Sequence, residues 1–161
     1  MNANTHTYAL TVEWTGNTGQ GTARPNAYSK NHVVHARGRP DILASSDPAF
    51  NGDADRYNPE ELLVAALSQC HMLWFLSRCA KHGVVVTAYL DGAIGTMVEH
   101  RDGGGEFVNV TLRPRIILAS PADPELLARL HEESHHLCFI ARSVNFPVEV
   151  EPEYSTQEIQ V

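Results

Sequence analysis

The sequence predicts one long helix over residues 58–82, and this helix constrains the fold more than any other feature. Asn58 can cap it, Pro59 suits its first position, and the two Glu residues that follow favour the positive end of the helix dipole. Gly83 supplies a stop. Apolar side chains lie on most of the helix circumference, which is typical of a central, buried helix. We therefore expect the remaining elements to pack around this axis.

Strand-like segments precede the helix. Residues 8–14 alternate between apolar and polar side chains in the manner of a half-buried strand, and extended segments follow at about 28–36 and 40–44. These three segments predict a small antiparallel sheet. Residues 45–57 contain Pro, Gly and several charged side chains, and they predict a loop.

The elements after the helix predict the fold class. The expected order is a β-hairpin with a Gly-rich turn, a second helix that begins at Asp-Pro-Glu, and a last strand; the ranges are 84–99 and 106–119, 123–138, and 145–154. This order lacks the parallel βαβ rhythm, so we expect an α+β protein. No repeat or linker divides it, and one domain over residues 1–161 is predicted.

Composition excludes several classes of function. The 161 residues include 12 Lys and Arg against 19 Asp and Glu, a net charge of −7, which argues against a nucleic-acid binder. No secretory signal precedes residue 8, and polar side chains interrupt the apolar stretch 62–80, so no membrane span is expected. Three cysteines cannot all pair, which favours reduced thiols and a cytoplasmic protein.

The three cysteines differ in their positions. Cys70 lies in the middle of the first helix, and Cys79 follows nine residues later, about half a revolution away, so these two cannot face each other. Cys138 ends the second helix. Free cysteines are commonly small core residues, and we interpret Cys79 in this way.

The surroundings of Cys70 and Cys138 resemble the family of osmotically inducible protein C and organic hydroperoxide resistance proteins (the OsmC/Ohr family). In that family Asn-Pro-Glu precedes a helix of small residues and a Cys ten positions after the Glu, which is the spacing from Glu60 to Cys70. A second hallmark, a Cys before a short apolar-Ser-Val run, is similar to residues 138–144. The resemblance covers nearly the whole chain, and residues 91–97 are similar to an OsmC-like subgroup.

This resemblance implies a fold and an activity. The fold would have antiparallel sheets wrapped around two central helices in an intertwined homodimer. The activity would be thiol-dependent reduction of organic hydroperoxides, with Cys70 as the peroxidatic thiolate and Cys138 as the resolving thiol. The implied reductant is a dithiol, which for the hydroperoxide resistance proteins is a lipoylated partner protein. No metal, nucleotide or flavin cofactor is implied.

Other residues of the implied site are less determined by the sequence. Ten residues of continuous helix would put Glu60 about 15 Å from Cys70, so the helix is broken near its start, or Glu60 serves a Cys70 of another subunit, or it is only a helix-start acid. The family site also uses an Arg from the N-terminal region. Lys30, Arg37 and Arg39 are candidates that no spacing rule separates, and a solvated charge on a strand is the more common role of such a residue.

Aromatic side chains near the cysteines are candidates for substrate binding. Trp74 and Phe139 could line an apolar pocket for an organic hydroperoxide, and core packing is the alternative.

Two other classes of function stay open. One is a non-catalytic, stress-associated binding protein on the same fold. The other is a zinc-dependent hydrolase, because His131-Glu132-x-x-His135 has metalloprotease spacing. Helix-end or exposed histidines are the simpler interpretation of that motif, and we expect His71 and His82 to be polar edges of the first helix.

Overall fold

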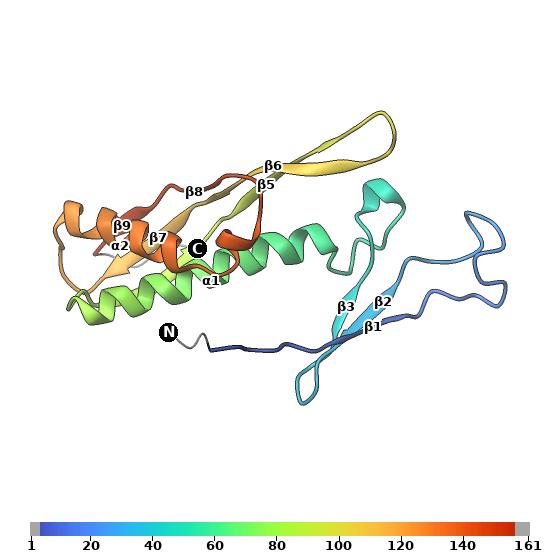
Figure 1. Cartoon of the computed structure of the whole chain (residues 1–161), viewed down its shortest axis with the longest axis horizontal. Coiled ribbons are helices and arrows are strands. Elements are labelled where there is room, and N and C mark those ends of the chain that lie inside the picture. Colours follow the sequence, from blue (N-terminus) through green and yellow to red (C-terminus); the bar gives the residue numbers. More distant parts are fainter. Residues whose placement is uncertain (1–3, 157–161) are drawn as a thin grey trace. The chain divides into compact units, whose positions relative to one another are not determined.

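The computed structural model describes residues 4–156, and the chain forms two compact units, residues 1–62 and 63–161 (Figure 1). The expectation of one domain over residues 1–161 stays a prediction, because a cluster of contacts is not an independently folding domain.

The first unit contains the predicted antiparallel sheet. Its strands are β1 (Thr11–Trp14), β2 (His32–His35) and β3 (Ile42–Ala44), paired in the order β1-β2-β3. The expected half-burial of β1 is wrong, because all four of its residues are exposed. A three-stranded sheet without a second layer of its own leaves such side chains in solvent.

The predicted loop between this sheet and the first helix contains one short 3₁₀ turn, η1 (Pro48–Phe50). The carboxylate of Asp47 accepts a hydrogen bond from the amide of Ala49 and caps this turn. Asn51 ends it with a φ of 60°, a left-handed conformation that Asn tolerates better than most residues.

Helix α1 (Pro59–Lys81) matches the predicted long helix, and its start is a capping box. The side-chain oxygen of Asn58 accepts the amide of Glu61 at 2.8 Å, and the Glu61 carboxylate accepts the amide of Asn58 at 3.1 Å. Of the two Glu residues at the start of α1, Glu61 is therefore the one that completes the capping box.

The burial of α1 differs from the expectation of a helix covered on all sides. Its buried residues form one stripe at four-residue spacing, namely Leu67, His71, Phe75 and Cys79. Leu73, on another face, is 61% exposed. By length and composition alone α1 could cross a membrane, contrary to the expectation from its polar side chains, but its buried stripe belongs to the core described next.

Three chain segments build the sheets of the second unit. The predicted hairpin is present, but each of its arms is broken into two strands, β4 (Val86–Asp91) with β5 (Ile94–Glu99), and β6 (Gly105–Leu112) with β7 (Pro114–Leu118). The last predicted strand is also two strands, β8 (Val148–Val150) and β9 (Glu153–Ser155). The resulting sheets have the orders β4-β7-β9 and β5-β6-β8.

The expectation of wholly antiparallel sheets needs a correction here. β8 pairs with β6, and β9 pairs with β7, in parallel, whereas β4–β7 and β5–β6 are antiparallel. The chain reaches β8 through the second helix, and such a crossover permits parallel pairing. The α+β class is confirmed, with mixed sheets in this unit.

Asp91 forms hydrogen bonds that bridge the break in each arm of the hairpin. Its carboxylate accepts the amide of Arg113 at 2.7 Å, from the opposite break between β6 and β7, and it also accepts the hydroxyl of Ser68 on α1. One side chain thus links both arms of the hairpin to the helix.

Helix α2 (Pro124–Leu137) packs on α1 in the second unit (Figure 1). The Asp123 side chain caps it through the amide of Glu125 at 3.0 Å. Leu127 and Leu130 join Phe75, Cys79 and strand residues in one apolar cluster; Leu67 anchors a second cluster with strand β6.

Candidate active site

Two cysteines meet where α1 faces the end of α2. Cys138 is the C-terminal cap of α2 and is only 1% exposed; its amide donates to the carbonyl of His135 at 3.2 Å. Its sulfur accepts the amide of Ala141 at 3.4 Å, from the short turn η2 (Ala141–Ser143). Cys70 projects from α1, is half-buried, and lies near enough to Cys138 to raise the pKa of that thiol.

The environment of Cys138 keeps its thiol protonated. Its pKa is raised to about 11, mainly by burial and to a smaller extent by the nearby Cys70 thiol, against the opposing effect of the Ala141 amide. Cys138 is therefore a neutral thiol at pH 7, sheltered from solvent. The two cysteines form an asymmetric pair in which Cys70 is the accessible member.

The third cysteine has a different environment. Cys79 lies in the apolar cluster with Phe75 and Leu127, and burial raises its pKa to about 11. Its interpretation as a core residue is confirmed. It therefore provides a matched control for experiments on the other two.

An aromatic pair adjoins the thiols. Trp74 lies one turn after Cys70 on α1, and Phe139 follows Cys138; their rings pack edge to face with centroids 5.8 Å apart. The guanidinium of Arg78 lies 5.8 Å above the Trp74 ring, within the range of a cation–π contact. Phe139 is 68% exposed, so this pair forms an accessible apolar surface rather than core.

The histidines next to the site correct the sequence interpretation. His71 is 1% exposed and His131 is 7% exposed, so neither is a polar helix edge. Nε2 of His71 and Nδ1 of His131 are 2.9 Å apart, and the two rings are stacked. Alternation of polar and apolar residues gave no signal for this pair, because its formation depends on how α1 packs against α2.

Burial also sets the protonation of these two rings. It lowers the pKa of His71 to about 4, with a smaller effect of His135, and the pKa of His131 to about 3, with a smaller effect of His71. Both rings are neutral at pH 7. Within residues 4–156 no three His, Cys, Asp or Glu side chains gather as a metal site needs, and His131 is paired with His71 instead.

The other sequence candidates belong to the first unit. The ammonium of Lys30 donates to the carbonyl of Phe50, whereas Arg37 and Arg39 are exposed in the turn between β2 and β3. Glu60 is half-buried and, among the described residues, its carboxylate has no hydrogen bond or ion pair. Among the described residues, the Lys30 ammonium is therefore held by a backbone carbonyl, whereas the Glu60 carboxylate has no hydrogen-bond partner.

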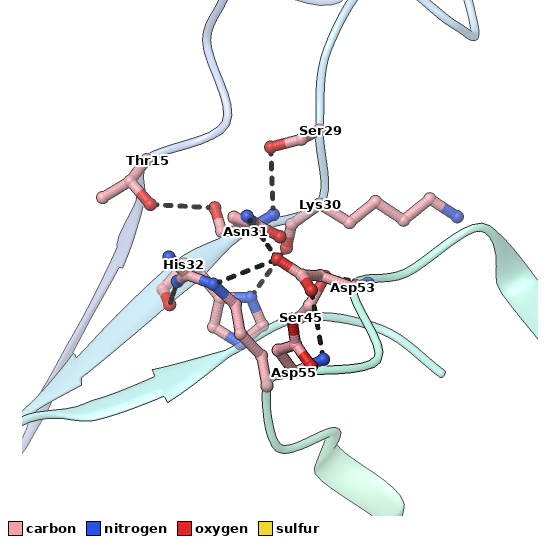
Figure 2. A network of polar contacts seen from close by, with 9 residues as sticks. Thr15, Ser29, Lys30, Asn31, His32, Ser45, Asp53 and Asp55 are labelled. Carbon is pink, nitrogen blue, oxygen red and sulfur yellow. Dashed lines mark hydrogen bonds and ion pairs between the residues drawn. The ribbon is translucent and has the colours of Figure 1, made fainter. Parts of the chain in front are cut away.

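A polar network that no sequence pattern predicted lies near Lys30 (Figure 2). The Asp53 carboxylate accepts the Asn31 side-chain amide at 3.1 Å, and it lies 3.4 Å from Nε of Arg56. Hydrogen bonds from the Asp55 amide and from Asn31 lower the pKa of Asp53. Arg56 also donates to the carbonyl of His32 at 3.3 Å, so it adds a fourth cation to the candidates.

The fold and the cysteine pair define the class of protein: an α+β protein with thiols from two packed helices. A family model described as OsmC-like protein matches residues 52–153. The chain belongs to this OsmC-like family.

Similarity to solved structures agrees with this assignment. An OsmC-like protein of unknown function from Vibrio cholerae O1 biovar eltor is 33% identical, with a TM-score of 0.83 over 92% of this chain and 100% of that one. An organic hydroperoxide resistance protein from Legionella pneumophila shares the fold at 14% identity, with a TM-score of 0.66 over 94% of this chain and 99% of that one. The Bacillus subtilis organic hydroperoxide resistance protein OhrB has 17% identity and a TM-score of 0.62, covering 93% and 98%. No curated protein matches the sequence.

Proposed function

We propose that this protein is a thiol-dependent peroxidase that reduces organic hydroperoxides, with Cys70 as the peroxidatic residue and Cys138 as the resolving residue. The observation that carries the proposal is the asymmetric pair: an accessible Cys70 beside a buried, protonated Cys138. Both the family and the hydroperoxide resistance proteins that share the fold support a role in redox stress.

The first step oxidises Cys70. Its thiolate attacks one oxygen of the hydroperoxide, the O–O bond breaks, and the alkoxide takes a proton to leave as an alcohol. The sulfur gains the other oxygen and becomes a sulfenic acid. Burial of Cys138 disfavours the thiolate there, so attack on peroxide at that sulfur is suppressed.

The second step forms a disulfide. The Cys138 sulfur attacks the Cys70 sulfenic acid, its thiol proton is lost, and the sulfenic oxygen leaves as water. The Cys70 thiol lies near enough to Cys138 to raise its pKa, and this proximity supports the step. An external dithiol then reduces the disulfide and is itself oxidised; a lipoylated protein is one such partner.

The substrate would bind through its organic group. Trp74 and Phe139 offer an accessible apolar surface next to the sulfurs, and such surfaces favour an alkyl or aryl hydroperoxide over hydrogen peroxide. We therefore propose that preference for organic hydroperoxides depends on this aromatic pair.

Glu60 and an N-terminal cation would complete the site from a partner subunit. Helix α1 is unbroken from Pro59 to Lys81, which removes the option of a break that brings Glu60 to Cys70 of the same chain. We propose an obligate homodimer in which Glu60 of one chain serves Cys70 of the other. Lys30, Arg37, Arg39 and Arg56 are the candidate cations, and reduced cysteines fit a cytoplasmic location.

Turnover of cumene hydroperoxide and of hydrogen peroxide with a dithiol tests the proposal. We expect Cys70→Ser to abolish rapid turnover and Cys138→Ser to accumulate over-oxidised Cys70, whereas Cys79→Ala should keep turnover. An unmodified protein without turnover would refute the proposal and favour a non-catalytic binding function. Bound stoichiometric zinc with hydrolase activity would instead favour the metal alternative.

A further inference from the structure

The buried pair of His71 and His131 lies beside the thiols and has no part in the steps above. His71 follows Cys70 on α1, and His131 lies two helical turns before Cys138 on α2. The bond between Nε2 of His71 and Nδ1 of His131 is therefore a polar side-chain link between the two helices that carry the cysteines.

The pair is a poor way to gain stability. Each neutral ring has one donor and one acceptor, so the bond between the rings uses one of each. The two outer nitrogens, Nδ1 of His71 and Nε2 of His131, are buried and have no hydrogen-bond partner among the described residues. In either tautomer one donor and one acceptor stay unpaired, a cost that two apolar side chains would avoid.

The histidine pair restricts how α2 can slide along α1. Phe75 of α1 stacks on the His131 ring at a centroid distance of 4.0 Å, and the hydrogen bond between the two rings, with its nitrogens 2.9 Å apart, tolerates little displacement. Apolar contacts between helices are less directional than a hydrogen bond. A disulfide between Cys70 and Cys138 has a narrow geometric range, so a small slip of α2 along α1 would separate the sulfurs.

We propose that His71 and His131 are positioning residues that lock the axial register of α2 against α1 and so keep Cys138 in reach of Cys70. The inference deepens the proposed function, on which its catalytic consequence rests. The register itself can be measured without any peroxidase activity.

The effective concentration of the Cys70–Cys138 pair, measured in glutathione redox buffers, tests the proposal. The variant combines His71→Leu with His131→Phe, which removes both polar rings and keeps an aromatic ring against Phe75. Ser134→Ala is the matched control, because this buried hydroxyl of α2 donates only to the carbonyl of Leu130 in the same helix.

We expect the double variant to keep its folded helical content and to lose about fivefold in effective concentration, because the hydrogen bond that fixes the register of the two helices is absent. His131→Gln, whose amide can still bond to His71, should recover part of the loss, and Ser134→Ala should resemble the parent. A folded double variant within about twofold of the parent would overturn the proposal. If the double variant does not fold, His131→Phe alone takes its place with the same criteria.

The same variants separate this proposal from the proposed function. After one equivalent of cumene hydroperoxide, we expect Cys70 to be oxidised at the parental rate and the disulfide to form more slowly. A parent that forms the disulfide in glutathione but consumes no peroxide would refute the peroxidase alone. A double variant that forms the disulfide as fast as the parent would refute the positioning role.

Discussion

Acid should destabilise this protein through one identifiable pair of side chains. Burial lowers the pKa of His71 to about 4 and that of His131 to about 3, from an ordinary value of 6.5. Between pH 6.5 and pH 4 the unfolded chain binds a proton on each ring and the folded chain does not. Unfolding then takes up protons, so the free energy of unfolding falls as the pH falls.

The magnitude follows from this window. Down to pH 5 each ring contributes about 2 kcal/mol of lost stability, roughly 4 kcal/mol for the pair, at about 1.4 kcal/mol per pH unit and ring. Domains of this size have only about 5–15 kcal/mol in total. The pair should therefore dominate the response of the protein to mild acid.

Urea unfolding at pH 7 and pH 5 measures this response, at one protein concentration because the stability of the proposed dimer would depend on that concentration. The parent should lose roughly 4 kcal/mol more than the variant that carries His71→Leu and His131→Phe. His35, whose pKa is raised mainly by Asp41, responds in the opposite direction in both proteins and cancels in the difference. An equal pH dependence of parent and variant would refute the reasoning.

Three further predictions concern stability and the proposed site. Gly95→Ala should lower the free energy of unfolding by about 1–3 kcal/mol, since an added Cβ would meet side chains of α1 and β6 at 2.6 and 2.7 Å, whereas Gly92→Ala has open space and should cost less; urea unfolding compares the two. Asn58→Ala removes one partner of the capping box and should cost about 1 kcal/mol in the same assay, and no loss would contradict the cap. Glu60→Gln should lower the free energy of unfolding by less than about 1 kcal/mol, because Glu60 takes no part in that cap and acts only on the helix dipole. It should nevertheless lower peroxide turnover, and full activity would remove Glu60 from the site.

The sequence predicted those elements whose signals are local. The capped start of α1 at Asn58 and of α2 at Asp123 was readable because capping chemistry acts within four residues. The breaks in the hairpin were not, since they depend on Asp91 reaching the opposite strand and α1. The sequence also did not predict that β8 pairs with β6, and β9 with β7, in parallel. The alternation of polar and apolar residues along a strand does not depend on the direction of the neighbouring strand.

The site divides in the same way. The residues around Cys70 and Cys138 carried the family resemblance, but the proximity of the two thiols and the burial of His71 against His131 arise from helix packing. Strand β1 was predicted to be half-buried and α1 to be covered on most of its circumference, yet β1 is exposed and α1 is covered on one side. Apolar composition indicates that a surface is covered, but it does not indicate which molecule covers it. We propose that a second copy of the chain does so.

The most direct test of the proposed peroxidase mechanism is to map the products of a single oxidation. The reduced protein is mixed with one equivalent of cumene hydroperoxide, quenched with an alkylating reagent and digested for peptide mass analysis. The account predicts a disulfide between Cys70 and Cys138, one equivalent of alcohol, and Cys79 recovered as an alkylated thiol. Recovery of all three cysteines as alkylated thiols, with the hydroperoxide unconsumed, would contradict it.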